Sequence, residues 1–255
     1  MGDWRIRHGE AIDSFLKYLN SETTSFVLKG GTALMKCYSL DRFSEDIDLD
    51  STPQNAETLK KLIARFCNEA GYSSRTAKDT DTVQRHMLNY GNTQKPLKIE
   101  VSFRRREIRA EDVISVNDIT TYDINVLCIM KSNAYSARDK LRDLFDLAFI
   151  CNNYYDELNH VAKEVMRLAV ENKGIEQFDY IIREQTDELI DIVKLEDSFL
   201  KMYDKLGLLY TRDEKAVTEP PSLRDTLAAN QIKAAEQNTE LPTPPAADKP
   251  KTIDE

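Results

Sequence analysis

The sequence predicts an α+β fold made of two parts, and three observations support this prediction. The chain has 255 residues and is 41% hydrophobic, which is enough to bury the cores of two modest domains. Residues 1–118 mix helical and strand-like patterns of apolar residues, whereas residues 119–210 keep a helical pattern with few glycines. Residues 211–255 are rich in proline and polar residues, and this composition predicts a linker and a largely disordered tail.

Apolar patterns predict the elements of the first part in order. A helix is indicated where apolar residues recur every three to four positions, and a strand where they alternate or form a short run. Two glycine signals mark ends, because Gly30-Gly31 closes one apolar run and Gly71 stops one helical pattern. The expected elements are a helix over 10–19, a strand over 25–28, a helix over 32–38, a strand over 46–50, a helix over 56–70, and strands over 83–90 and 97–103.

The second part is predicted to begin with one long helix over 126–150. At about 100° per residue, Lys131, Arg138 and Arg142 form one basic stripe along this helix. An adjacent acidic stripe consists of Asp139, Asp143 and Asp146. Two interpretations stay open, namely salt bridges on a solvated face or a site for a polyphosphate. Downstream, Val161, Val165, Leu168 and Ala169 keep the spacing of one helix face, which is interpreted either as packing in a helical bundle or as a surface for a partner.

Composition excludes some classes of function. The net charge of −9 excludes a uniformly basic surface for nucleic acid. A local cluster at Arg104-Arg105-Arg106 and Arg109 is interpreted either as a contact for RNA phosphates or as a solvated loop. No run approaches the ~20 apolar residues of a membrane span, and the first residues predict no secretion signal. The four scattered cysteines then predict reduced thiols in a cytoplasm.

The most informative segment is Phe26–Asp50, FVLKGGTALMKCYSLDRFSEDIDLD. Two glycines between a strand and a helix let backbone N–H groups approach an anion, and the Thr32 hydroxyl can assist. Asp46 and Asp48 project from one face of a strand, roughly 7 Å apart. With no cation on that face they repel each other, and a shared divalent metal relieves this repulsion. Either feature alone is typical of a turn or a solvated edge, whereas together they favour a metal site.

A third carboxylate follows on the strand expected over 97–103. Glu100 projects from the face opposite Ile99 and Val101. Three carboxylates from two strands can hold two divalent ions, which would orient a triphosphate and stabilise a pyrophosphate leaving group. The alternative interpretation is a solvent-facing strand residue.

The pattern G-G-T, then R-F-S-E-D-I-D-L, then a strand carboxylate resembles the nucleotidyltransferase superfamily of polymerase-β type. The wording KGGTAL…RFSEDIDL resembles the AbiEii/AbiGii toxin family, which is similar to the MenT toxins. The resemblance implies a nucleotidyltransferase palm over 1–118, a small mixed sheet flanked by helices, and a helical domain over 119–210. It further implies that Asp46, Asp48 and Glu100 are catalytic metal ligands. The implied ligands of the nucleotide phosphates are Gly30, Gly31, Thr32, Arg42 and Ser44.

The segment after residue 130 resembles the second signature of the same family. Lys131 matches the family's lysine, and residues 142–147 match its R-D-x-x-D-L pattern. By resemblance, Lys131 contacts the triphosphate, Arg142 also binds nucleotide, and Asp143 is a functional carboxylate. The choice between Asp143 and Asp146 for that carboxylate stays open.

The resemblance implies transfer of NMP from an NTP, with Mg²⁺ as cofactor and Mn²⁺ as its alternative. It points to a toxin of a toxin–antitoxin or abortive-infection system that defends against phage, with the tRNA 3′ end as acceptor and a cognate antitoxin as partner. The alternatives are transfer to a protein or small-molecule hydroxyl, and a catalytically silent NTP-binding module. Intact Asp46, Asp48, Glu100 and Lys131 disfavour the silent module. Which NTP is used, and how many metals bind, stays open.

Overall fold

The computed structural model describes residues 4–91 and 95–209, so the tail expected over 211–255 lies outside the described residues. The described helices are α1 (Trp4–Glu22), α2 (Gly30–Cys37), α3 (Ala56–Ala70), α4 (Ile124–Ala137), α5 (Leu141–Tyr154), α6 (His160–Glu184) and α7 (Ile192–Lys205). The described strands are β1 (Val27–Lys29), β2 (Asp46–Asp50), β3 (Ser73–Thr80), β4 (Val83–Asn89), β5 (Leu97–Ser102), β6 (Val113–Val116) and β7 (Ile119–Tyr122). The described residues up to Leu208 belong to one compact unit.

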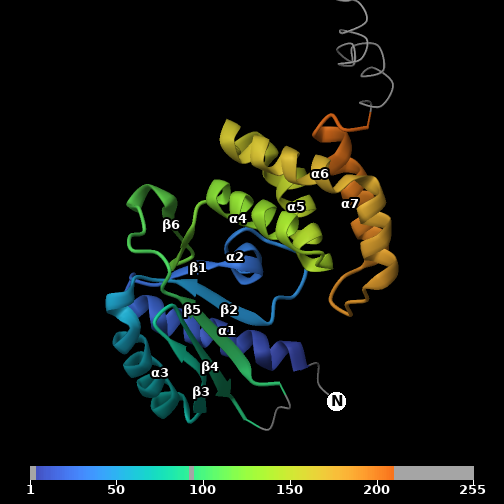
Figure 1. Cartoon of the computed structure of the whole chain (residues 1–255). Helices are drawn as coiled ribbons and strands as arrows, with labels where there is room; N and C mark the ends of the chain where they lie inside the picture. The colour runs from blue at the N-terminus through green and yellow to red at the C-terminus, as the bar shows by residue number, and fades with distance from the viewer. Residues whose placement is uncertain (1–3, 92–94, 210–255) are drawn as a thin grey trace, which may run out of the picture. The chain divides into compact units, whose positions relative to one another are not determined.

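In this part of the chain the strands form one seven-stranded sheet in the order β3-β4-β5-β2-β1-β7-β6. The pairs β2–β5 and β1–β7 are parallel, and the other neighbours are antiparallel. Helices α1 and α3 lie on one side of the sheet, and α4 to α7 lie on the other (Figure 1). The predicted α+β fold is therefore confirmed.

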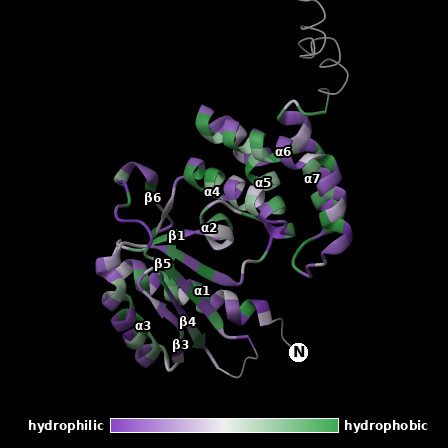
Figure 2. Ribbon diagram, viewed as in Figure 1, coloured by the Kyte–Doolittle hydropathy of each residue, from purple (hydrophilic) through white to green (hydrophobic). Residues whose placement is uncertain are grey.

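The core determines which face of the central strands carries polar groups. Ile47 and Leu49 of β2 and Ile99 of β5 are buried in the apolar core. Because side chains alternate along a strand, Asp46 and Asp48 face the opposite side, toward α4. Hydrophobic residues, green in Figure 2, recur along α4, α5 and the central strands. The polar side chains of β2 thus face the helices α4 to α7, whose own apolar residues also belong to the core.

All seven elements expected within residues 10–103 occur, with ends shifted by a few residues. The sequence did not predict β3, because its residues are all exposed and show no apolar alternation. It also did not predict β6 and β7, and β7 extends the sheet beyond residue 118. The sheet therefore crosses the expected end of the palm, and the division into 1–118 and 119–210 stays a prediction.

The single helix expected over 126–150 is wrong. The chain leaves the helix at Arg138 (φ −155°, ψ 154°) and resumes it after Lys140 (φ −126°, ψ 124°). The Gln185 side chain stabilises this break, since its amide donates to the Asp139 carbonyl (2.7 Å) and accepts from the Leu141 N–H (3.1 Å). Gln185 lies at the C-terminal end of α6, far from the break in sequence. The periodicity of residues 126–150 therefore could not predict this contact.

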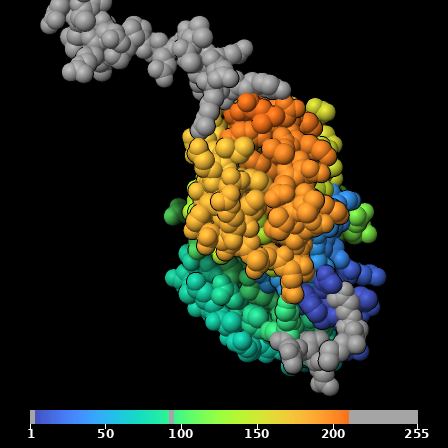
Figure 3. Space-filling view, turned by 90° about the vertical axis from the view of Figure 1, so that its right-hand side faces the viewer, coloured from blue at the N-terminus to red at the C-terminus, as the bar shows by residue number. Residues whose placement is uncertain are grey.

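The helix face expected at Val161, Val165, Leu168 and Ala169 of α6 is only partly buried. Val161 and Leu168 are exposed, whereas Ala169 is buried. The helix instead packs on α4 through small residues, with the Cys128 thiol 3.7 Å from the Ala162 carbonyl. Figure 3 shows α6 and α7, in gold and orange, forming one side of the molecular surface.

Candidate active site

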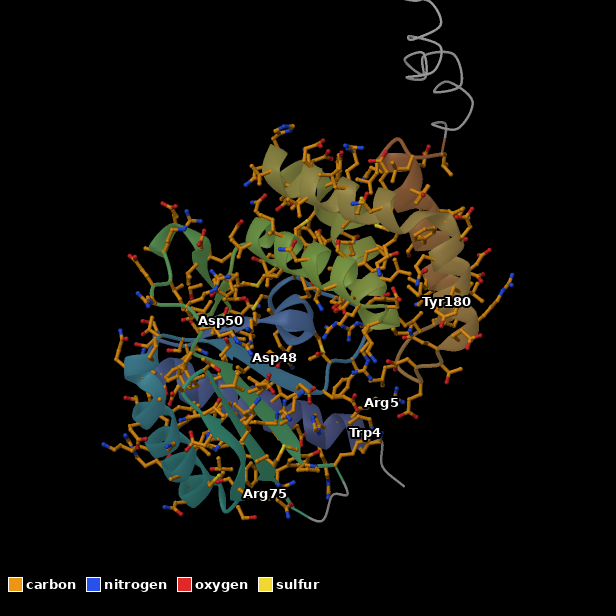
Figure 4. The ribbon with its side chains drawn as sticks, viewed as in Figure 1. Trp4, Arg5, Asp48, Asp50, Arg75 and Tyr180 are labelled. Atoms are coloured by element: carbon orange, nitrogen blue, oxygen red, sulfur yellow. The ribbon has the colours of Figure 1, made fainter. Side chains whose placement is uncertain are left out.

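A cleft of about 490 Å³ lies between the polar face of the sheet and helix α4. Asp48 and Glu100 line it from the sheet, and Lys131, Arg138 and Asp143 line it from the helical side. Figure 4 labels Asp48 on β2, beneath α4. We call Asp46, Asp48 and Glu100 the acidic floor, and Arg42, Lys131, Arg138, Asp143 and Asp146 the charged wall.

Strand register brings the acidic floor together. In the parallel pair β2–β5, Asp48 stands opposite Glu100 and Asp46 stands opposite Lys98. Side chains opposite each other in neighbouring strands share a face of the sheet. The three carboxylates predicted from two strands therefore lie on one face, although Asp46 is not among the residues that line the cleft.

Two cations pair with carboxylates of the acidic floor, and the sequence did not predict either pairing. The Lys98 ammonium lies 2.6 Å from Asp46, and the Arg85 guanidinium lies 2.6 Å from Glu100. The expectation of a face without cations is therefore wrong. Lys98 belongs to the neighbouring strand, so the pattern of β2 by itself gives no sign of it.

Asp48 differs from its two neighbours on the acidic floor. Among the residues that the structure describes, no side chain forms an ion pair or hydrogen bond with its carboxylate. Burial raises the pKa of Asp48, the Lys98 ammonium opposes that rise, and the charges of Asp46 and Glu100 add to it. Asp48 is thus a half-buried carboxylate that lines the cleft and has no direct partner among the described residues.

Gly30 allows the backbone to pass close to Asp48. Its φ of +76° lies in the left-handed region that favours glycine, and an added Cβ would lie 3.2 Å from the Asp48 carboxylate. The two glycines line the cleft at the start of α2, where the backbone N–H groups of a helix are unpaired.

The third acid of β2, Asp50, is a buried structural carboxylate. It accepts hydrogen bonds from the Lys29 ammonium (2.5 Å), the Tyr122 hydroxyl (3.0 Å) and the Arg105 guanidinium (3.2 Å). Burial and the Asp50 charge raise the pKa of Tyr122, so its hydroxyl stays protonated and donates. Tyr122 and Arg105 lie too far along the chain to be seen in the alternation of β2.

The charged wall is built around two buried carboxylates of α5. Asp143 accepts from Arg138 (2.7 Å) and lies 3.3 Å from the Lys131 ammonium. Burial favours a higher pKa for Asp143, but the Arg138 hydrogen bond and the Lys131 charge outweigh it and lower that pKa. Asp146 is fully buried, with Lys131 at 2.5 Å and two Arg42 nitrogens at 2.7 Å. Only Asp143 of the two carboxylates lines the cleft.

Four predicted nucleotide ligands are not among the cleft-lining residues. Thr32 is buried and donates to the Ser44 hydroxyl (2.9 Å) and to the Asp46 carbonyl. Arg42 pairs with Asp146 as described. Arg142 contacts Asp187 (2.5 Å) and Glu45 (3.0 Å), which are outside the cleft lining. The predicted ligands that do line the cleft are Gly30, Gly31 and Lys131.

A divalent cation would find the right kind of ligand on the acidic floor. Carboxylate oxygens are the ligands that Mg²⁺ prefers, and Asp48 has no competing ion pair within the described residues. Across residues 4–91 and 95–209, no three acidic, histidine or cysteine side chains are already arranged to hold a metal ion. The donor set therefore fits the metal in chemistry, while Asp46 and Glu100 are held by cations.

The chain is similar to known proteins over most of its length. A family model described as "Nucleotidyl transferase AbiEii toxin, Type IV TA system" matches residues 15–229. The crystal structure of JHP933 from Helicobacter pylori matches with 24% identity and a TM-score of 0.67, covering 92% of this chain and 99% of that one. A second H. pylori crystal structure matches with 26% identity and a TM-score of 0.66, covering 86% and 100%.

A more distant match is MenT4, nucleotidyltransferase toxin Rv2826c from Mycobacterium tuberculosis H37Rv. Its identity is 16% and its TM-score 0.50, with 89% of this chain and 92% of that chain covered. No curated protein matches the chain. No helix among the described residues is long and apolar enough to cross a membrane.

Proposed function

The chain belongs to the AbiEii family of nucleotidyl transferase toxins, and from this premise we propose that it transfers NMP from an NTP to the 3′ end of tRNA. The acceptor hydroxyl oxygen forms a bond to the α-phosphorus. The bond between the α-phosphorus and the oxygen that bridges it to the β-phosphate breaks, and pyrophosphate leaves. The observation that carries the proposal is the Asp48 carboxylate, which has no ion-pair partner among the described residues and lines the same cleft as Lys131 and Arg138.

The acidic floor would hold Mg²⁺, or Mn²⁺ as its alternative, through Asp46, Asp48 and Glu100. The bound metal would neutralise charge on the triphosphate and on the leaving pyrophosphate. Glu100 lies beside Asp48 and pairs with a partly exposed Arg85, so it is the carboxylate we propose to take the proton of the acceptor hydroxyl.

The charged wall would bind the triphosphate. Lys131 and Arg138 line the cleft, and the start of α2 at Gly30-Gly31 offers unpaired backbone N–H groups to the same anion. Between the two candidate carboxylates, Asp143 is the one we propose to be functional, because it lines the cleft and holds both cations. Its role is to orient Lys131 and Arg138 toward the phosphates.

An RNA acceptor is supported by Arg104 at the edge of the cleft. It lines the cleft and, within the described residues, forms no ion pair. An unpaired guanidinium in a chain of net charge −9 suits a phosphate backbone. The proposed setting is the cytoplasm, where NTPs and tRNA occur and where the four free cysteines would stay reduced. A cognate antitoxin, as in type IV systems, is the proposed partner.

The test is a label-transfer assay. Purified protein is incubated with Mg²⁺, each α-³²P-labelled NTP in turn, total RNA and a protein extract, and the products are separated on a denaturing gel. We expect label in the tRNA band, and none with EDTA or with Asp48→Ala. The control Glu69→Ala, an exposed acid on α3, should transfer as the wild type does. Label on a protein band would replace the acceptor, and wild-type transfer by Asp48→Ala would refute the metal site.

A further inference from the structure

A buried ion pair joins the loop before β2 to helix α5. The Arg42 Nε and Nη2 atoms each lie 2.7 Å from an Asp146 carboxylate oxygen, in a two-pronged arrangement. The Arg42 and Asp146 side chains are 3% and 0% exposed, and a third Arg42 nitrogen donates to the Phe43 carbonyl at 3.1 Å. Arg42 therefore has no free face with which to meet a nucleotide.

Gly31 makes room for this pair. A Cβ at Gly31 would lie 2.6 Å from Arg42 Nη2 and 2.9 Å from the Ser44 hydroxyl, both too close for real contacts. The R-x-S residues thus pack beneath the first turn of α2. Their packing explains the second glycine without invoking a phosphate.

The same Asp146 carboxylate also holds Lys131. The Lys131 ammonium lies 2.5 Å from Asp146 Oδ2 and 3.3 Å from Asp143 Oδ1, and its side chain lines the cleft. The charged wall contains three cations and two carboxylates, so one positive charge is in surplus beside the cleft. Without Arg42 that surplus of charge would vanish, and Lys131 would be the remaining ion-pair partner of Asp146.

We infer that Arg42 and Asp146 are positioning residues that hold the Lys131 ammonium in the cleft. Arg42 then acts on the nucleotide only through Asp146 and Lys131. The inference rests on the proposed function, since it takes Lys131 to be the triphosphate ligand. It differs from the family pattern's simplest reading, in which the arginine of R-x-S touches the phosphates itself.

A double-mutant cycle tests the inference. Binding of a non-hydrolysable NTP analogue and the kcat and KM of transfer are measured for Arg42→Met, Lys131→Met and the double variant. We expect each single change to weaken analogue binding about tenfold, and Arg42→Met to add less than about twofold in the Lys131→Met background, because coupled residues are not additive. If the loss of analogue affinity in the double variant equals the product of the two single losses, Arg42 binds nucleotide independently of Lys131, and the inference is overturned.

Fold integrity is controlled separately. Arg65→Met removes a partly exposed arginine paired with Glu22 between α3 and α1, and should bind the analogue as the wild type does. If Arg42→Met fails to fold, Arg42→Lys takes its place, because it keeps the charge and loses the two-pronged contact. Its loss of binding should also disappear in the Lys131→Met background, and an undiminished loss there would overturn the inference.

The cycle separates the two claims. Wild-type protein that binds no NTP analogue would refute the proposed function together with the inference. Lys131→Met protein that binds the analogue normally would refute Lys131 as a ligand, and with it the inference, but not the transfer reaction. Normal wild-type binding with multiplicative losses would refute the inference alone.

Discussion

The two sides of the cleft hold their charges in different ways. On the acidic floor, Asp46 and Glu100 each have one cation partner at a partly exposed position, and Asp48 has none within the described residues. In the charged wall, Asp143 and Asp146 are buried and each contacts two cations. Exposed pairs contribute about 0–1 kcal/mol, whereas loss of one partner from a buried pair costs about 3–5 kcal/mol.

This difference separates exchangeable charges from fixed ones. The contacts of the floor cost little to open, so its carboxylates are ready to bind an incoming cation. The wall is preorganised, because its cations are already held in place before a phosphate arrives. Variants of the wall should therefore lower stability as well as nucleotide binding, whereas variants of the floor should impair transfer with little loss of stability.

The largest loss of stability is expected for Asp146→Ala. This change leaves Arg42 and Lys131 without their shared buried carboxylate, and should lower the free energy of unfolding by about 3–5 kcal/mol. Urea denaturation followed by circular dichroism measures the loss. A loss below about 1 kcal/mol would show that the wall is no more fixed than an exposed pair.

A smaller loss is expected for Gly31→Ala. The added methyl group would meet the Arg42 guanidinium at 2.6 Å, and overpacking of this kind costs about 1–3 kcal/mol. The double variant Gly31→Ala with Arg42→Met should lose less than the two single losses combined, because the collision with the guanidinium is then absent and only the one with the Ser44 hydroxyl remains. Additive losses in urea denaturation would contradict this contact.

The smallest effect, and the opposite sign, is expected for Asp48→Asn. Folding raises the Asp48 pKa above its ordinary 3.8, so the ionised carboxylate is less stable in the folded than in the unfolded protein. Removing its charge should raise the free energy of unfolding at neutral pH by up to about 1 kcal/mol, while abolishing transfer.

The pH dependence of this gain has a defined direction. The favourable contribution of Asp48 is complete below its ordinary pKa and is lost as pH rises through the raised value, so the advantage of Asp48→Asn should grow from pH 4 to pH 7. Asp143, whose pKa is lowered, stabilises the fold above its ordinary 3.8 and stops doing so in more acidic solution. An advantage of Asp48→Asn that shrinks toward neutral pH would contradict the assignment.

The sequence predicted the floor far better than the wall. Two-residue alternation was enough to place Asp46, Asp48 and Glu100 on one polar face, because strand geometry is local and its register follows the buried side chains. The glycine pair correctly marked the start of α2. The Lys98 and Arg85 partners were missed, since a neighbouring strand supplies each of them.

The wall could not be predicted because its partners are distant in sequence. Arg42 and Asp146 are 104 residues apart, and periodicity shows which face a residue occupies but not what meets it. The break after α4 depends on Gln185, 46 residues beyond Asp139. If residues 138–140 were helical, the basic and acidic stripes would be neighbouring surfaces of one continuous helix.

That break determines whether the wall exists at all. Lys131 and Asp143 are 12 residues apart, and in one unbroken helix they would be separated by about 18 Å along its axis. The non-helical corner turns the chain back so that their charged atoms meet at 3.3 Å. Straightening this corner would dismantle the wall while every charged side chain remained in the sequence. The corner is thus as much a requirement of the site as any of its charges.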